Sequence, residues 1–270
     1  MHAIGATGTY AAELELALEI ADAADALAMA RYRADDLVIE TKPDATPVTE
    51  ADQAVERMIR ATLAERRAGD AIVGEEFGGD LAAIAGARRW IVDPIDGTKN
   101  YLRGVPVWST LIGFAVGADV VVGVVSAPAM GRRWWAAQGA GAWTRDVDGS
   151  VRSIRVSGVR ALQDASFSYS DAIDWDRHSS TPGALQRLID VTWRQRGYGD
   201  FLSHMLVAEG AVDIGAEPTL APWDMAALIP VIVEAGGRAT GYRGGDPIAQ
   251  TSLLSSNGLL HDAVLQRILE

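Results

Sequence analysis

Four apolar segments follow one another between residues 107 and 145, separated by glycines and short polar breaks. They read WSTLIGFAV, DVVVGVVSAP, RRWWAAQ and GAWT, and they are rich in β-branched and aromatic residues. Such residues suit a pleated, half-buried surface, and short breaks between them are typical of hairpins. We therefore expect these segments to form neighbouring antiparallel strands.

The chain before these strands alternates between helical and extended patterns. Apolar residues recur at helical spacing from about residue 10 to 32 and again over 50–67. The polar stretch 41–49 contains two prolines and predicts a loop. Short apolar runs at 71–73 and 90–92 predict buried strands.

Strands and helices continue to alternate beyond about residue 150. We expect strands near 166–169, up to 198 and over 211–216, and helices over 183–192, 201–210, 224–235 and from about 259. This alternation predicts an α/β (α+β) fold of layered sheets and helices, with any internal boundary near residue 150.

Charge and composition exclude several classes of protein. The 270 residues carry a formal net charge of −12, whereas a general nucleic-acid binder needs a basic face. No apolar run reaches the roughly 18 residues that a membrane-spanning helix needs, and the N-terminus lacks the pattern of a secretory signal. The absence of cysteine excludes disulfides and thiolate metal sites, and we expect a cytoplasmic protein.

The most informative motif follows the apolar run at 90–92. Asp93 ends this strand, Pro94 disfavours a helical conformation for Asp93, and a second carboxylate follows at Asp96. Gly97 lets the backbone approach a ligand closely, and the amides of Gly97 and Thr98 could bind an anion if they begin a helical turn. A plain surface turn is the alternative, because Asp, Pro and Gly favour turns. One loop could therefore offer two metal-binding carboxylates beside a phosphate site.

Two further acids stand at comparable places. Glu75 comes directly after the strand at 71–73, although a solvated loop acid would look the same. Asp224 precedes an apolar helical segment and could instead be a helix N-cap, worth about 1 kcal/mol. All of these candidate ligands are oxygens, which favours Mg²⁺. Zinc would require suitably spaced His or Cys, and the four histidines are scattered.

Taken together and in this order, these segments resemble the inositol monophosphatase-like family of metal-dependent phosphatases. The resemblance covers nearly the whole chain, to the Asn257-Gly258 turn. Its carriers are Lys42 with Asp44, Val48-Thr49-Glu50-Ala51-Asp52, Gly74-Glu75-Glu76, Asp93-Pro94-Ile95-Asp96-Gly97-Thr98 and Trp223-Asp224. The resemblance implies a layered αβαβα sandwich, usually assembled as a homodimer. It also implies an N-terminal α+β subdomain (1–150) that carries the metal loop and a C-terminal α/β subdomain (151–270), together forming one compact catalytic unit.

The resemblance also implies roles for individual residues. Two or three Mg²⁺ ions would be held by Glu75, Asp93, the Ile95 carbonyl, Asp96 and Asp224. Asp93 would bridge two ions, and paired metals of this kind lie about 3.5–4 Å apart. Thr98, oriented by Asp52 and acting with Glu75, would position the attacking water. The amides of Gly97 and Thr98 would hold the phosphate. Lys42 matches a family lysine near the metal loop and would contact the substrate, although its spacing to Asp52 is a residue short.

The substrate must be read from residues outside the metal loop. Inositol-type members tend to carry a small residue where this chain has Asp200, and Glu217 matches a position that contacts the organic part of the substrate. Two acids would suit a substrate with positive charge near its phosphate. The pattern therefore resembles the histidinol-phosphatase branch, which releases phosphate from L-histidinol phosphate in histidine biosynthesis. The alternatives are capping of the helix at 201–210 by Asp200 and a solvated role for Glu217.

Other residues near these acids have less specific readings. Tyr198, Trp108 and Trp223 could stack on an imidazole, but aromatic residues at such places more often belong to the core. Arg103 could contact phosphate or a partner subunit. His204 lies one helical turn after Asp200, so we expect these two side chains to pair.

The closest rival function is an inositol-1-phosphate or sugar phosphatase that uses the same metals. A non-catalytic protein- or RNA-binding partner is a rival from another class, which the acidic charge and the complete acid set disfavour.

Overall fold

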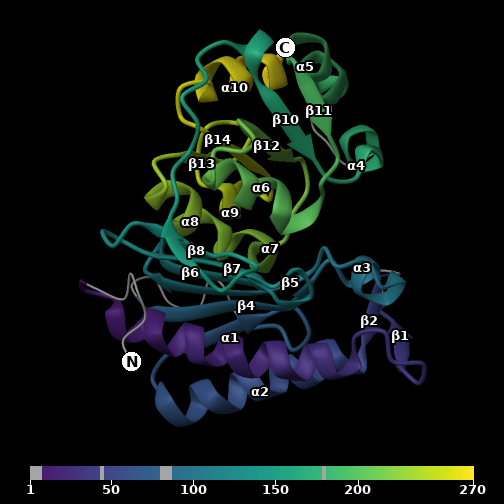
Figure 1. The fold of residues 1–270 in the computed structure, drawn as a ribbon, viewed down its shortest axis with the longest axis vertical. Coiled ribbons are helices and arrows are strands. Elements are labelled where there is room, and N and C mark those ends of the chain that lie inside the picture. The colour runs from purple at the N-terminus through teal and green to yellow at the C-terminus, as the bar shows by residue number, and fades with distance from the viewer. Residues whose placement is uncertain (1–7, 43–45, 80–86, 178–180) are drawn as a thin grey trace.

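The computed structural model describes residues 8–42, 46–79, 87–177 and 181–270, and these form five layers of alternating helices and sheets (Figure 1). Two long helices, α1 (Ala11–Arg31) and α2 (Glu50–Arg66), form the first layer beneath a seven-stranded sheet. A central helical layer separates this sheet from a five-stranded sheet, and helices cover the far side of the latter. The predicted layered αβαβα sandwich is confirmed.

The seven-stranded sheet contains the strands predicted between residues 107 and 145. Its strands in chain and spatial order are β3 (Ala71–Gly74), β4 (Arg88–Asp96), β5 (Ser109–Val116), β6 (Asp119–Ala127), β7 (Arg132–Ala137), β8 (Ala142–Arg145) and β9 (Val151–Ser153). Strands β3 and β4 are parallel, and every later neighbour pairs antiparallel.

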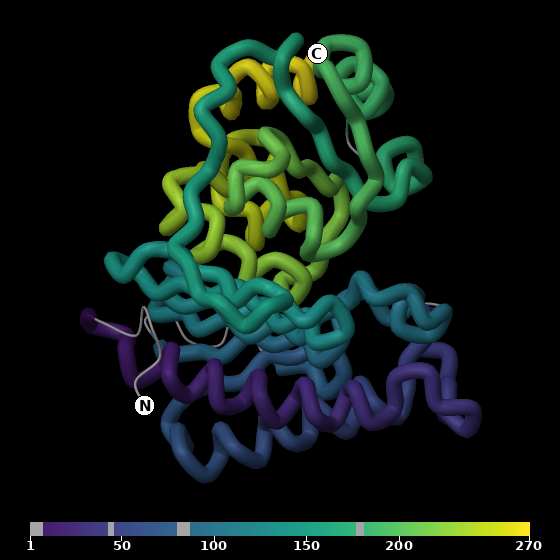
Figure 2. The backbone as a smooth tube through the Cα atoms, viewed as in Figure 1, coloured from purple at the N-terminus to yellow at the C-terminus, as the bar shows by residue number. Residues whose placement is uncertain are grey.

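The five-stranded sheet has the order β11-β10-β12-β14-β13, so the chain crosses over between its strands. The strands are β10 (Ser166–Tyr169), β11 (Arg194–Arg196), β12 (Ile214–Glu217), β13 (Arg238–Thr240) and β14 (Leu253–Ser256). Strand β10 pairs parallel with both β11 and β12, whereas β14 is antiparallel to β12 and β13. Figure 2 shows the chain rising from the lower layers to this upper sheet after β9.

The remaining helices fill the central and outer layers or flank the sheets. They are α3 (Thr98–Arg103), α4 (Ala172–Arg177), α5 (Ala184–Val191), α6 (Asp200–Ala208), α7 (Pro222–Ala226), α8 (Leu228–Glu234), α9 (Pro247–Gln250) and α10 (His261–Leu269). No helix in the described ranges is long and apolar enough to cross a lipid bilayer.

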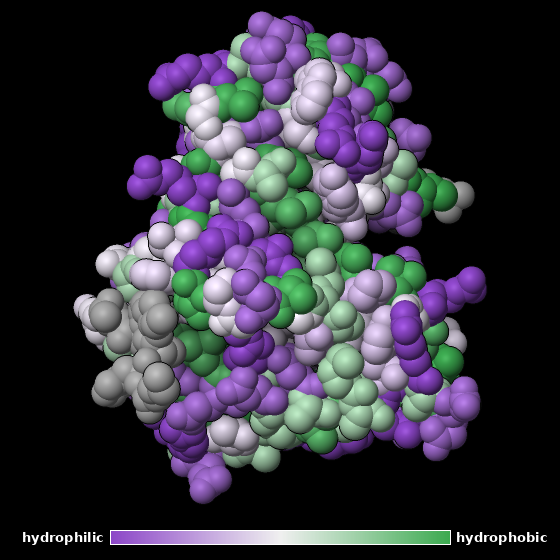
Figure 3. Space-filling model, viewed as in Figure 1, coloured by the Kyte–Doolittle hydropathy of each residue, from purple (hydrophilic) through white to green (hydrophobic). Residues whose placement is uncertain are grey.

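Three main apolar cores hold the layers together. One lies between the α1–α2 layer and the large sheet, a second between that sheet and α6 and α8, and a third between the small sheet and α5 and α10. On the face shown in Figure 3, hydrophobic side chains gather midway, where the central helices meet the large sheet. Burial of these faces is the main favourable contribution to folding.

Two strand glycines bring the central helices unusually close to the large sheet. A Cβ at Gly113 in β5 would lie 3.0 Å from Ala226 Cβ, and a Cβ at Gly123 in β6 would overlap the Ala227 carbonyl. Two small residues on the helical side and two glycines on the sheet side therefore allow direct backbone packing. This packing brings Asp224, two residues before Ala226, next to the end of β4.

Several expected boundaries were wrong. The stretch 41–49 was expected to be a loop, but β1 (Ile39–Thr41) and β2 (Pro47–Thr49) pair there as an antiparallel ribbon. The strand expected at 90–92 continues past Pro94 to Asp96, because a register shift against β5 removes the need for a proline N–H. The single helix expected over 224–235 is divided into α7 and α8.

Candidate active site

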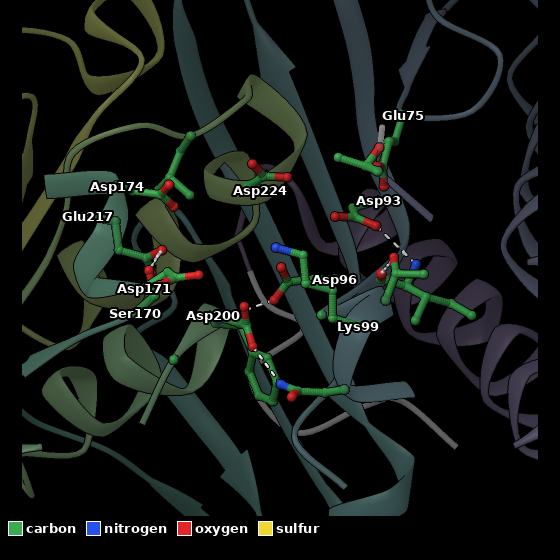
Figure 4. A pocket seen from close by; sticks show the side chains of 18 of the residues that line it. Glu75, Asp93, Asp96, Lys99, Ser170, Asp171, Asp174, Asp200, Glu217 and Asp224 are labelled. Atoms are coloured by element: carbon green, nitrogen blue, oxygen red, sulfur yellow. Dashed lines mark hydrogen bonds between the residues drawn. The ribbon is translucent and has the colours of Figure 1, made fainter. Parts of the chain in front are cut away.

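A cavity of about 440 Å³ opens where β4, α3, β10, α6, β12 and α7 come together. The outline of the molecule is indented between α3 and α4 (Figure 3), and residues of both helices line the cavity. Eight carboxylates line it: Glu75, Asp93, Asp96, Asp171, Asp174, Asp200, Glu217 and Asp224. Lys99 is the only basic residue among the described residues of the lining. Figure 4 shows Glu75 and Asp93 on one side of the cavity and Asp171, Asp174 and Glu217 on the other.

The irregular end of β4 places two of these acids. The register of β4 against β5 shifts between Asp93 and Asp96, and a bulge of this kind redirects side chains. Asp93 Oδ1 accepts from the Ile95 N–H at 2.9 Å, and the Pro94 carbonyl accepts from Thr110 Oγ1 at 2.8 Å. The bulge is therefore hydrogen-bonded on both sides, and it aims both carboxylates into the cavity.

Asp224 reaches the same point from α7. It is the third residue of that helix and not its N-cap, which is Ala221, yet its Oδ2 accepts from the Ala221 N–H at 2.7 Å. Carboxylate oxygens of Asp93, Asp96 and Asp224 lie within 4.8 Å of one another. The residue thus stabilises the helix start with one oxygen while its carboxyl group belongs to the acidic cluster.

The three carboxylates strongly disfavour each other's ionised form. Burial, together with Glu75, Asp96 and Asp224, raises the pKa of Asp93 well above its usual range. Burial and neighbouring acids likewise raise the pKa of Asp96 far above normal and that of Asp224 to about 7. Buried carboxylates at such spacing are unfavourable unless a cation balances them. An all-oxygen donor set of this kind fits a hard divalent cation such as Mg²⁺.

Glu75 lines the same cavity but lies outside the group of three. Its Oε1 is 2.7 Å from Lys42 Nζ, which also contacts Glu76 Oε1 at 2.7 Å. Lys42 is not among the residues that line the cavity, and its expected neighbour Asp44 lies outside the described residues. A role for Glu75 as a metal ligand and for Lys42 as a substrate contact stays a prediction.

Glu56 of α2, which was not singled out in the sequence, holds the turn that carries Glu75. Its buried carboxylate accepts from the amides of Glu76 at 2.7 Å and Phe77 at 3.2 Å, and Arg60 Nε lies 2.8 Å away. A Cβ at Gly74 would overlap this carboxylate, so the glycine is required for the contact. The turn after β3 is therefore fixed from below by α2.

Gly97, Thr98 and Asp52 meet next to the acidic cluster. Gly97 has a φ of 81° and is the N-cap of α3, so the chain begins a helical turn at Thr98 as the motif required. Thr98 Oγ1 lies 3.1 Å from the Ile95 carbonyl and 3.4 Å from Asp52 Oδ1. Asp52 is also the third residue of α2 and closes the capping box with Thr49, whose amide donates to Asp52 Oδ2 at 2.8 Å. Burial raises the pKa of Asp52 to about 6.

Asp200 lies beside Asp96 in the cavity (Figure 4), and the next residue, Phe201, donates its N–H to Asp96 Oδ2 at 3.0 Å. Its φ of 48° is in the left-handed region, a conformation that is uncommon outside glycine and often found at functional sites. It is the first residue of α6 and makes no capping hydrogen bond, because its Oδ2 accepts from Asn100 Nδ2 at 2.8 Å. Burial, with Glu217 nearby, raises the pKa of Asp200 to about 7. Helix capping, the alternative reading, does not describe this side chain.

Glu217 is buried and hydrogen-bonded, so the alternative of a solvated acid is wrong. Its Oε2 accepts from Ser170 Oγ at 2.6 Å, and His204 Nε2 lies 3.1 Å from its Oε1. The expected pairing of His204 with Asp200 is also wrong, because the imidazole turns toward β12 and β14 instead. Trp108 is fully buried, and neither Tyr198, Trp223 nor Arg103 is among the residues that line the cavity.

Four lining residues carried no signal that was used in the sequence. Lys99 follows the acidic motif directly, and its ammonium points between Asp96 and Asp224 (Figure 4). Ser170, Asp171 and Asp174 lie at the end of β10 and in α4, and they reach the cavity because β10 pairs with β12. A sheet order read from sequence would have been needed to find them.

Comparisons with known proteins agree with this geometry. The profile of the inositol monophosphatase family matches residues 11–270. A histidinol-phosphatase from Mycobacterium tuberculosis is 53% identical over 260 residues, which cover 95% of this chain and 97% of that protein. A histidinol-phosphatase from Streptomyces coelicolor is 50% identical over 260 residues, covering 95% of this chain and 96% of that protein. The solved IMPase of Thermotoga maritima superposes with a TM-score of 0.82 at 29% identity, covering 95% of this chain and 96% of that one.

Proposed function

Because this chain belongs to the inositol monophosphatase family and is a phosphoric monoester hydrolase, we propose that it converts L-histidinol phosphate into L-histidinol and phosphate. The observation that carries the proposal is one cavity that holds the Asp93–Asp96–Asp224 cluster, in which Asp93 is buried and the other two are half-buried, and a second acidic wall at Asp200 and Glu217. The three-acid cluster suits binding of the metals and the phosphate, and the wall formed by Asp200 and Glu217 suits the cationic part of a substrate.

In the proposed mechanism, two or three Mg²⁺ ions would be held by Asp93, Asp96, Asp224, Glu75 and the Ile95 carbonyl. When bound, magnesium supplies Lewis-acid polarisation of the phosphoryl oxygens and lowers the pKa of water. The raised pKa values of Asp93, Asp96 and Asp224 support this assignment, because a cation is what would let these groups ionise together.

Thr98 and Asp52 orient the attacking water. Thr98 lines the cavity, and when its hydroxyl donates to Asp52 Oδ1, 3.4 Å away, its lone pairs are free to accept from a water there. Asp52 is buried and its pKa is raised to about 6, so it can accept a proton near neutral pH. This pair fixes the direction of attack without forming a covalent intermediate.

The start of α3 binds the phosphate. The amides of Gly97 and Thr98 are free donors at a helical start, and the Lys99 ammonium adds a positive charge in a cavity otherwise lined by acids. The charge of Lys99 also acts on Asp200, where it opposes the rise in pKa that burial causes, and Lys99 is the one basic side chain in the described lining that an anionic ligand can meet. Lys99 therefore joins the predicted phosphate-binding residues.

Asp200 and Glu217 select the organic part of the substrate. Histidinol phosphate carries an ammonium group, and a cation beside Asp200 would restore the ionised form of a carboxyl whose pKa is raised to about 7. Charge-assisted hydrogen bonds of this kind contribute about 1.5–3 kcal/mol each, which is enough to discriminate against neutral polyols.

The wider assembly is part of the same proposal. The enzyme is a homodimer that acts in the cytoplasm, and subdomains 1–150 and 151–270 work as one catalytic unit. The two large sheets support a division close to this boundary, because the seven-stranded sheet ends with β9 (Val151–Ser153) and the five-stranded sheet begins with β10 (Ser166–Tyr169).

Phosphate release from purified protein tests the substrate. The assay compares histidinol phosphate, inositol-1-phosphate and fructose-1,6-bisphosphate, each with magnesium and with EDTA. We expect kcat/KM for histidinol phosphate to be at least about tenfold higher, equal to about 1.4 kcal/mol, and activity to vanish in EDTA. Equal use of the three substrates would contradict the proposed substrate while leaving the phosphatase activity in place.

An inositol-1-phosphate phosphatase is the second candidate. The structural likeness to the Thermotoga maritima IMPase favours it, because that likeness spans the whole fold. A preference for inositol-1-phosphate in the same assay would establish it instead.

A further inference from the structure

The two acids of the second acidic wall, Asp200 and Glu217, belong to different elements, and the buried imidazole of His204 lies between those elements. Asp200 begins α6, and Glu217 ends β12. His204, one turn into α6, is fully buried and faces β12. A side chain in this position can fix the geometry of the cavity wall without entering the cavity.

Hydrogen bonds at both ring nitrogens define the orientation of His204. Its Nε2 lies 3.1 Å from Glu217 Oε1, and its Nδ1 lies 2.7 Å from Ser255 Oγ. Ser255 can donate its single hydrogen either to Nδ1 or to the Gly215 carbonyl at 3.3 Å. The Glu217 carboxylate can only accept a hydrogen bond, so the imidazole carries a hydrogen on Nε2. This Nε2–H donates to Glu217 whichever acceptor Ser255 uses.

The surrounding backbone leaves room for this contact and little else. A Cβ at Gly215 would lie 2.7 Å from Ser255 Oγ and 3.2 Å from His204 Nδ1. Separations this small would force one partner to move. A glycine in the middle of β12 is therefore what allows the imidazole to pack between strand and helix.

The result is a Glu217 carboxylate that is held at both oxygens. Ser170 Oγ donates to Oε2 at 2.6 Å, while His204 donates to Oε1. Glu217 is only 5% exposed, yet it lines the cavity, so the part of it that remains accessible is reached from the cavity. A carboxylate fixed in this way loses little conformational freedom when a cation binds to it.

From these contacts we infer that His204 is a positioning residue that holds Glu217 as the acceptor for the cationic end of the substrate. It thereby sets the preference for cationic over neutral phosphate esters. The inference rests on the proposed function. The role is indirect, because His204 touches Glu217 and not the cavity.

Two substitutions of similar size separate this role from simple packing. In His204→Gln the side-chain amide reaches the former Nε2 position and can still donate to Glu217. In His204→Asn the amide reaches only the Nδ1 position, so it keeps Ser255 and loses Glu217. The readout is the ratio of kcat/KM for histidinol phosphate to that for inositol-1-phosphate, with KM and kcat resolved separately.

We expect His204→Asn to lower this ratio about tenfold, mainly through a higher KM for histidinol phosphate, and His204→Gln to retain most of it. His261→Asn is a matched control, because His261 is also fully buried and bridges two hydroxyls, Ser256 Oγ at 2.8 Å and Thr240 Oγ1 at 2.8 Å. His261 does not line the cavity, so this variant should lose stability but keep the ratio.

Two further variants keep the test decisive if His204→Asn folds poorly. Ser170→Ala removes the other donor to Glu217 and should lower the ratio in the same direction. In a Glu217→Gln background, His204→Asn should cause little further loss, since residues that act through one group are not additive. An unchanged ratio in His204→Asn, or a full additional loss in the Glu217→Gln background, would overturn the inference. A wild-type protein with no preference for histidinol phosphate would instead overturn the proposed substrate.

Discussion

Asp224→Asn should make the metal-free protein more stable while abolishing its response to magnesium. Burial and the neighbouring acids raise the pKa of Asp224 to about 7 in the folded chain, compared with about 3.9 in an unfolded one. The folded state therefore disfavours the charged carboxylate. The contribution of the Asp224 carboxyl to the free energy of unfolding is fully present below about pH 4 and is lost as the pH rises through about 7.

The size of the effect follows from this difference in pKa. A rise from about 3.9 to about 7 corresponds to about 4 kcal/mol near pH 8. Because the Asp224 carboxyl keeps partial contact with solvent, we expect about 2–4 kcal/mol. Asparagine removes the charge but retains an oxygen that can accept from the Ala221 amide, now 2.7 Å from Asp224 Oδ2. Near pH 4.5 the gain should shrink to about 1 kcal/mol or less.

Urea denaturation of both proteins at the two pH values, in EDTA and in magnesium, measures this directly. In EDTA near pH 8 the variant should be the more stable protein. In magnesium the order should reverse, because only the wild type gains the free energy of metal binding. A variant that is no more stable than wild type in EDTA near pH 8 would refute the claim that these acids repel one another in the absence of metal.

Three other changes test separate parts of the account. Lys99→Met should raise the inhibition constant of inorganic phosphate about tenfold, measured by product inhibition, because it removes a charge-assisted contact; an unchanged constant would exclude Lys99 from phosphate binding. Glu56→Gln leaves fewer acceptors for the amides of Glu76 and Phe77, which loosens the turn that carries Glu75. The magnesium concentration for half-maximal activity should therefore rise about tenfold or more, and a change in the KM for substrate alone would contradict this. Burial lowers the pKa of His261 to about 4, so the wild type should lose about 2–3 kcal/mol as the pH falls from about 6.5 to 4, and His261→Gln should flatten this slope in acid denaturation.

The three acids of the cluster could be predicted because each has a local signature. Asp93 and Asp96 follow an apolar strand and flank a proline, and the glycine after them begins a helix. Asp224 looked like a helix cap, and its oxygen does accept from the Ala221 amide. What brings Asp224 to Asp93 is the close packing allowed by Gly113 and Gly123, which no local pattern in α7 reveals.

The opposite wall of the cavity depends on strand order and could not be predicted. Asp171 and Asp174 are ordinary polar residues in the sequence, and they reach the site because β10 lies beside β12. Strands β13 and β14 were missed because they are short, with a polar start in one and two serines in the other. His204 turned away from Asp200 because Glu217 and Ser255, both distant in sequence, lie within hydrogen-bond reach.

The most direct measurement of the central claim is anomalous diffraction from crystals soaked in Mn²⁺, which replaces Mg²⁺ at oxygen-rich sites. We expect peaks enclosed by Asp93, Asp96 and Asp224, with Glu75 turned toward them, and we expect phosphate added to the soak to lie against Gly97 and Thr98. A map without peaks among these carboxylates, in crystals of protein that releases phosphate, would contradict the account.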